Sequence, residues 1–128
     1  MTDKTILIIG TYDTKNDELE FIAGKIRALG GGTLTLDVSV LGDPGQPTDI
    51  SKHEVAEAGG SSIDTAIASG SEHVAMNIMS EGACLLARQL CDAGRIDGVI
   101  ILGGTMGTDL ALDVCRRLPL GFPKYVVS

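Results

Sequence analysis

Apolar residues occur along the chain in two patterns, short continuous runs and longer stretches with helical spacing. Continuous runs at 5–9, 33–40, 96–102 and 122–127 predict buried strands, because strands covered on both faces are aliphatic throughout. The stretches between them repeat apolar residues every three or four positions and predict helices. Strands that alternate with helices favour an α/β fold, a doubly wound parallel sheet of the Rossmann-like, three-layer kind.

The order of the strands decides where a ligand would bind. For about four strands the predicted order is 2-1-3-4, in which the first and third strands are neighbours. From the first strand the sheet is extended one way to the second strand and the other way to the third, so the strand order reverses between the first and third strands. Doubly wound sheets bind ligands at the carboxyl edge beside such a point. We expect a single domain over residues 1–128 and, because the chain stops directly after an apolar strand, a fragment of a longer protein.

Polar and small residues predict where several helices begin and how they pack. Ser51 and Glu54 have the Ser-x-x-Glu spacing of a capping box. Thr14 is predicted to cap the first helix, since its hydroxyl can accept from a free backbone N–H. Within the long helix expected over 71–94, Gly82 predicts close packing against a neighbouring element.

A glycine- and threonine-rich turn follows the first strand and contains the first candidate site residues. They are Gly10, Thr11, Asp13, Thr14 and Lys15. Glycine lets a phosphate approach the main chain, Lys15 can neutralise its charge, and Asp13 can hold Mg²⁺ or a ribose hydroxyl. The alternative is structural: Asp13 or Thr14 caps the helix while Lys15 is solvated.

A second turn of the same kind follows the third strand. Its candidate residues are Gly103, Gly104, Thr105, Gly107 and Thr108. Small residues, two hydroxyls and exposed amides suit a nucleotide phosphate, whereas the alternative is a tight turn in which glycine only permits packing. Neither turn has the spacing of a Walker A loop or of the dinucleotide fingerprint.

Asp37, near the end of the second strand, is the remaining candidate. Acidic residues at this position of dinucleotide-binding folds contact a ribose, and a turn-forming role is the alternative. His53 and His73 stand alone, and no Cys-x-x-Cys pair is present, so no metal site is predicted. No acid–base pair or activated nucleophile is evident in the sequence, and no catalytic residue is assigned.

Composition limits the classes of partner. The net charge of −7 argues against nucleic acid, because a phosphate backbone requires a basic footprint. No apolar run is long enough to span a membrane, and no signal pattern opens the chain. Three cysteines without a disulfide spacing predict reduced thiols in a cytoplasmic protein.

The chain resembles a widespread family of uncharacterised bacterial, fungal and plant proteins. That family includes the ATP-binding N-terminal region of the tomato tobamovirus-resistance protein. The resemblance covers nearly the whole chain and rests on the two turns, Asp37-Val38, Asp49-Ile50-Ser51, Glu54-Val55-Ala56, the segment 118–124 and Val127-Ser128. It implies ATP binding between subdomains, of which this chain is the first, and a homodimer. Met106 departs from the family pattern, which usually has glycine there.

These observations lead to one hypothesis and two alternatives. The hypothesis is a nucleotide-binding subdomain that holds ATP, with or without Mg²⁺, in a cleft completed by a second subdomain. The first alternative is a nucleotide-dependent transferase or sugar-phosphate enzyme. The second is a non-catalytic assembly or regulatory module. The sequence leaves open whether the protein is an enzyme.

Overall fold

The chain alternates strands and helices, as its apolar pattern predicted. The computed structural model describes residues 4–45, 47–103 and 107–127. Its strands are β1 (Thr5–Gly10), β2 (Gly32–Asp37), β3 (Gly98–Leu102) and β4 (Lys124–Val127). Its helices are α1 (Asn16–Ala28), α2 (Lys52–Ala58), α3 (Ile63–Ala68), α4 (Glu72–Asp92) and α5 (Gly107–Arg117).

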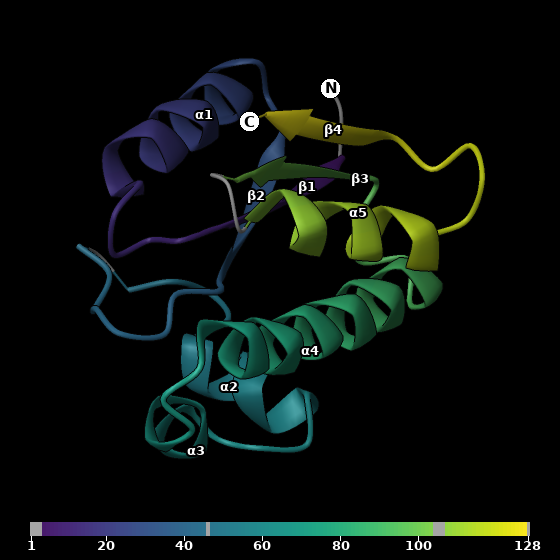
Figure 1. The fold of residues 1–128 in the computed structure, drawn as a ribbon. Coiled ribbons are helices and arrows are strands. Elements are labelled where there is room, and N and C mark those ends of the chain that lie inside the picture. Colours follow the sequence, from purple (N-terminus) through teal and green to yellow (C-terminus); the bar gives the residue numbers. More distant parts are fainter. Residues whose placement is uncertain (1–3, 46, 104–106, 128) are drawn as a thin grey trace.

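The strands form one parallel sheet with the order β2-β1-β3-β4 (Figure 1). In this register Ile9 of β1 lies beside Leu36 of β2 and Ile101 of β3, and Ile101 lies beside Val126 of β4. The predicted order and the Rossmann-like α/β class are therefore confirmed. All four carboxyl ends point to one edge of the sheet, because the strands are parallel.

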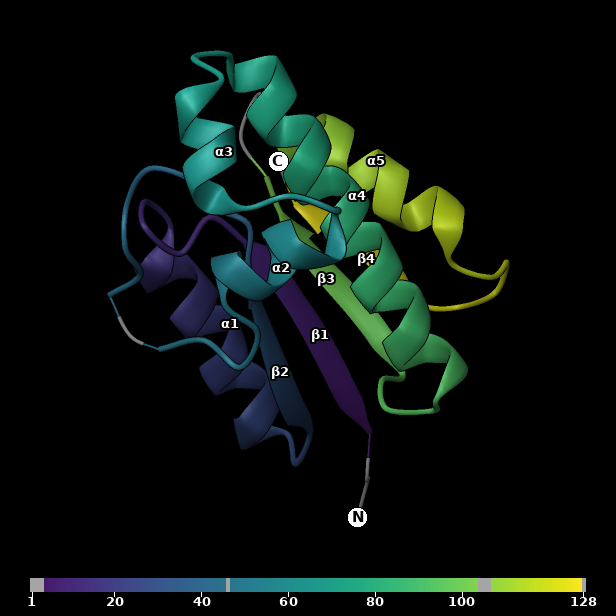
Figure 2. The same ribbon diagram turned by 90° about the horizontal axis from the view of Figure 1, so that it is seen from below.

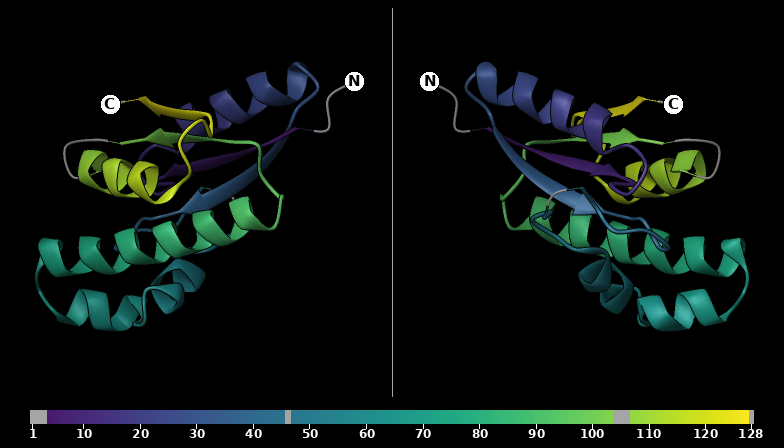
Figure 3. Two further views of the ribbon diagram at one scale, coloured as in Figure 1. Left: turned by 90° about the vertical axis from the view of Figure 1, so that its right-hand side faces the viewer. Right: turned by 90° about the vertical axis from the view of Figure 1, so that its left-hand side faces the viewer.

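Helices cover the two faces of the sheet unequally. Figure 3 shows α1 on one side of the strands, and α5, α4 and α2 on the other. On this second side α4 packs between α2 and α5, and α3 lies beside α4 and α2 at the end of the molecule (Figure 2). The predicted arrangement of helices on both faces is present.

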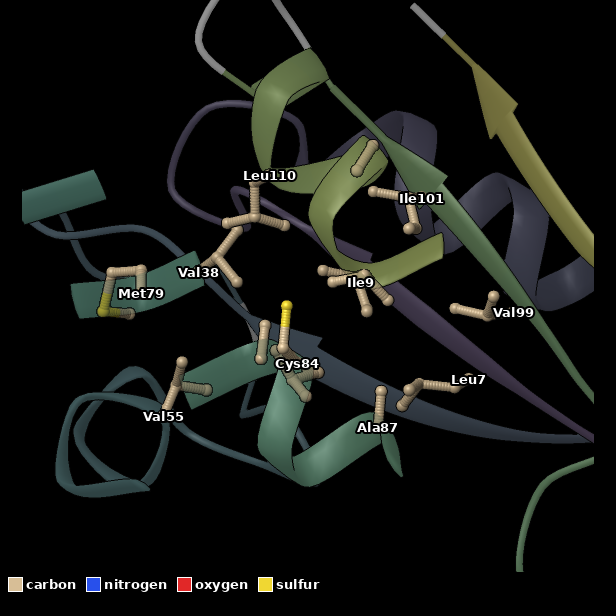
Figure 4. Packing of buried hydrophobic residues seen from close by; sticks show 14 of the residues in the cluster. Leu7, Ile9, Val38, Val55, Met79, Cys84, Ala87, Val99, Ile101 and Leu110 are labelled. Atoms are coloured by element: carbon tan, nitrogen blue, oxygen red, sulfur yellow. The ribbon is translucent and has the colours of Figure 1, made fainter. Parts of the chain in front are cut away.

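Each face has its own cluster of buried side chains. The larger cluster joins the strands to α2, α4 and α5, and Figure 4 shows Ile9, Ile101 and Cys84 among its members. The smaller cluster joins Ile8 of β1 to residues of α1 and includes Leu19. Aliphatic residues dominate both clusters, as the shortage of aromatic residues requires.

The predicted capping box is present, whereas the predicted cap of the first helix is wrong. The Ser51 hydroxyl accepts the Glu54 backbone N–H at 3.2 Å, and the Glu54 carboxylate accepts the Ser51 N–H at 3.3 Å. Helix α1 begins after Lys15, which makes no side-chain cap hydrogen bond. Thr14 lies one residue too early, and its hydroxyl is 2.9 Å from the hydroxyl of Thr11.

The second strand ends at Asp37, the residue near which the sequence placed its end, although the run assigned to it extended to Val40. Its carboxylate accepts the backbone N–H of Ser39 at 2.9 Å, an interaction typical of a turn. Apolar residues continue to Val40, but beyond Asp37 they leave the strand. The aliphatic run alone could not reveal this change of direction.

Gly82 permits a close approach of α2 and α4, which confirms the predicted packing of this glycine against a neighbouring element. A Cβ added to Gly82 would lie 1.9 Å from the backbone oxygen of Val55 in α2. Gly59 makes the reciprocal contact, since its Cβ would lie 2.3 Å from the backbone oxygen of Ile78 in α4. The two helices therefore cross with their main chains nearly in contact.

Candidate functional site

A cavity of about 590 Å³ lies at the carboxyl ends of β1 and β2. Its first boundary is the turn between β1 and α1, represented by Thr11, Asp13 and Thr14. Its second boundary is the segment 38–41, which follows β2. The carboxyl edge of a parallel sheet is the usual ligand site of this fold class, so the cavity is the candidate functional site.

The third boundary of the cavity is formed by α3 and α4. Ala66 and Ile67 come from the end of α3, and Ala75 and Met76 come from the first turns of α4. Gly70, Ser71 and Glu72, which connect the two helices and open α4, complete this boundary. The sequence predicted the helix start at Ser71, but no pattern in it placed α3 and α4 beside the first turn.

The first turn is held by hydrogen bonds within the chain. The backbone oxygen of Thr11 accepts the N–H groups of Thr14 at 3.2 Å and Lys15 at 2.8 Å. Asp13 Oδ2 accepts the backbone N–H of Gly42 at 3.2 Å, which joins the turn to the segment after β2. Thr11, Asp13 and Thr14 line the cavity, whereas Lys15 is half-buried and is not among its lining residues.

Asp37 is buried beneath the cavity boundary and binds backbone. Its Oδ1 atom accepts the N–H of Tyr12 at 3.2 Å and both the N–H, at 2.9 Å, and the hydroxyl of Ser39. The side chain is 1% exposed and is not a lining residue. Its Oδ2 atom is buried and has no partner in the part of the chain that the structure describes. In this conformation Asp37 connects the turn after β1 with the turn after β2.

Lys52 fixes the segment after β2 and was not found by sequence reasoning. Its ammonium group donates to the backbone oxygens of Gly42 at 2.7 Å and Val40 at 3.3 Å. It also forms an ion pair with Asp43 at 3.4 Å, although the lysine side chain is only 9% exposed. Since Val40 lines the cavity, Lys52 helps to position that boundary. A lysine in a short polar helix gives no sequence signal for this role.

The second glycine turn falls largely outside the described residues. Gly103 is buried, and its N–H donates to the backbone oxygen of Val127 at 2.9 Å. Gly104 and Thr105 lie outside the described residues, and α5 begins at Gly107, with Thr108 as its second residue. Because β3 pairs with β1, Gly103 lies at the same sheet edge as Thr11.

The ionisable side chains that line the cavity are acidic. They are Asp13, from the first turn, and Glu72, from the start of α4. Among the described lining residues none carries a positive charge. Within the described ranges, no helix combines the length and the hydrophobicity needed to cross a membrane.

The fold and the cavity define a Rossmann-like α/β domain with a small-molecule-sized cavity at its carboxyl edge. The chain belongs to the uncharacterised protein family UPF0261, whose N-terminal domain matches residues 4–128. This result confirms the family resemblance found in the sequence motifs.

Individual relatives support the same assignment. A UPF0261 protein of Brucella suis biovar 1 is 54% identical over 123 residues, which cover 96% of this chain and 29% of that protein. A UPF0261 protein of Clostridium tetani is 40% identical over 98% of this chain and 31% of its own length. The tomato ToMV resistance protein Tm-1(GCR237) is 29% identical over 96% of this chain and 18% of its own length. The chain thus spans about three tenths of the bacterial relatives.

Proposed function

We propose that this domain binds a nucleotide, ATP, at the carboxyl edge of its sheet. The main support for this proposal is the cavity of about 590 Å³ beside the turn between β1 and α1. Its volume falls within the range of about 300–1,000 Å³ typical of small-molecule sites. Hydroxyl and carboxylate groups of the first turn meet aliphatic side chains of α3 and α4 there, which suits a ligand that is polar at one end and apolar at the other. The resemblance of the sequence motifs to an ATP-binding family supports ATP as the nucleotide.

The proposed roles of the individual residues follow from their chemistry. Main-chain amides of the second turn, residues 103–108, bind phosphate, and Lys15 balances its charge. Asp13 or Asp37 takes a ribose hydroxyl or Mg²⁺. Asp13 is the better placed of the two, because it lines the cavity while Asp37 is buried and bonded to backbone.

The proposal includes a second subdomain that completes the binding cleft. The bacterial relatives are about three times as long as the matched region, which supports this part of the proposal. The homodimer and the cytoplasmic location remain predictions from the sequence. No reaction is proposed.

Calorimetry on the whole protein tests ATP binding directly. We expect saturable binding of ATP, and Gly107→Val should weaken it at least tenfold because the added side chain obstructs the approach of a phosphate to the main chain. Gly24→Ala is the control, since an added Cβ there has no heavy atom within 4 Å. Equal ATP affinity of wild type and Gly107→Val, or the absence of ATP binding by wild type, would contradict the proposal.

A further inference from the structure

The charge and the lining of the cavity indicate which end of a nucleotide it accepts. We propose that the cavity holds the uncharged end, the base and the ribose, and that the phosphates lie outside it, toward the carboxyl end of β3. This inference rests on the proposed nucleotide binding and assigns the orientation of the ligand within the site. It places the phosphates away from Thr11, Asp13 and Thr14, the first-turn residues that line the cavity, and leaves Lys15, which is not a lining residue, to balance their charge.

The charges in the cavity lining oppose a phosphate. Asp13 and Glu72 are the ionisable side chains in the described lining, and both are acidic residues. A phosphate placed between them would face like charges without a compensating cation. Lys52 does not supply one, because its ammonium group is already bonded to two backbone oxygens and Asp43. The cavity therefore disfavours the charged end of a nucleotide.

Much of the cavity lining is aliphatic. Ile67, Ala75 and Met76 come from α3 and α4, and Val38 and Val40 come from the segment after β2. Such side chains suit the flat face of a nucleobase, and the methionine thioether adds favourable contacts to an aromatic ring. Neither a phosphate group nor a free sugar phosphate gains from contacts of this kind.

The Asp13 carboxylate is partly engaged in hydrogen bonding within the chain. Asp13 Oδ2 accepts the Gly42 N–H, and this bond orients the side chain. Its Oδ1 atom has no hydrogen-bond partner among residues 4–45, 47–103 and 107–127, and is available to a ligand. Carboxylates accept hydrogen bonds from ribose hydroxyls in many nucleotide sites. Asp13 therefore suits a ribose hydroxyl, whereas its charge opposes a phosphate.

Separate binding measurements on the two parts of ATP, the nucleoside and the phosphate chain, provide the test. In the whole protein, adenosine and inorganic tripolyphosphate are each measured as ligands by calorimetry, for wild type and for Ile67→Asn. Ile67 is 46% exposed, so its replacement leaves the core intact. We expect Ile67→Asn to weaken adenosine and ATP about tenfold and to change tripolyphosphate less than twofold.

Val74→Asn is the matched control. Val74 is aliphatic, 42% exposed and also close to the start of α4, but it is not a lining residue. Its replacement should leave all three affinities unchanged. Two results would overturn this inference alone, provided that wild type binds ATP. In the first, Ile67→Asn loses affinity for adenosine and for tripolyphosphate equally; in the second, it loses no affinity for adenosine. Failure of wild type to bind ATP would overturn the proposed function as well.

Discussion

The two faces of the sheet carry similar aliphatic side chains but differ in how far helices cover them. Neighbouring residues of β3 show the difference: Ile101, on the face of α4 and α5, is 1% exposed, whereas Ile100, on the face of α1, is only half-buried. The contrast continues in β4, where Val126 is 38% exposed and Tyr125 is 68% exposed. Figure 3 shows the cause: α1 lies on one side of the sheet, whereas α2, α4 and α5 lie on the other.

The direction of the chain connections explains this difference. A right-handed connection from β1 to β2 places α1 on one face of the sheet. The connections to β3 and β4 run toward the opposite edge of the sheet, and because they are also right-handed, their helices lie on the other face. Helix α1 therefore packs mainly on β1 and β2, and it leaves most of β3 and β4 uncovered, although Leu102 of β3 packs against the smaller cluster. Leu102 and Val127 border a groove there together with Phe21 of α1. Topology, rather than the hydrophobicity of the strands, decides which part of the sheet is buried.

The largest expected effect compares one glycine from a helix on each face. Gly82→Ala should destabilise the protein by about 3 kcal/mol or more, because its Cβ would overlap the backbone oxygen of Val55 and force α2 away from α4. Gly24→Ala in α1 should stabilise it by about 0.5–1 kcal/mol, because alanine is the better helix former and the site is open. Urea unfolding monitored by circular dichroism measures both changes.

Equal effects of these two alanines would show that the close crossing of α2 and α4 does not exist. The crossing also positions the cavity, because α4 contributes Ala75 and Met76 to its lining. Loss of folding in Gly82→Ala and a raised midpoint in Gly24→Ala together support the described packing.

A smaller difference between the two variants is expected for a matched pair in β3. Ile101→Ala should cost about 3–4 kcal/mol, since it leaves a cavity in the larger cluster. Ile100→Ala should cost about half as much, because the uncovered face lets water replace the lost atoms. Chemical denaturation of both variants gives the two free energies of unfolding. A cost for Ile100→Ala equal to that for Ile101→Ala would mean that another element covers the α1 face.

The sequence predicted the sheet well because the physical signals are local. Continuous aliphatic runs marked the strands, and glycine and capping residues such as Ser51 and Ser71 marked the helices. The strand order 2-1-3-4 was the preferred topology for a parallel sheet with right-handed connections. The wrong helix cap also had a local cause, since Thr14 lies one residue too early, beside the hydroxyl of Thr11, and Lys15 precedes α1.

The candidate site was predicted only in part, because half of its boundary comes from distant segments. The first turn was found from its glycine and threonine residues, and Thr11 and Asp13 do line the cavity. Ile67 and Met76 could not be found, since apolar residues on α3 and α4 look the same whether they face a core or a cavity. Lys52 was missed because its acceptors are backbone oxygens, which leave no pattern in the sequence.

The smallest effect concerns the two tyrosines, which again differ in coverage. Tyr12 is 2% exposed and Tyr125 is 68% exposed. Burial, with smaller contributions from Glu20, Asp37 and Asp49, raises the pKa of Tyr12 well above its ordinary value. Its hydroxyl is buried and has no partner in the described ranges of the chain. Tyr12→Phe should therefore be neutral or slightly stabilising at pH 7, because no hydrogen bond is lost.

The raised pKa of Tyr12 makes stability depend on pH in the alkaline range. Below pH 10 the phenol is protonated in both the folded and the unfolded chain, so it has no effect on the pH dependence. Above pH 10 the unfolded chain loses this proton while the folded chain keeps it, so wild type should lose about 1.4 kcal/mol per pH unit relative to Tyr12→Phe. Tyr125→Phe, the exposed control, should follow wild type. If the free energies of unfolding of wild type and Tyr12→Phe changed in parallel between pH 9 and 11, the Tyr12 phenol would ionise as easily in the folded chain as in the unfolded one. That result would mean that α1 does not exclude water from this part of the sheet.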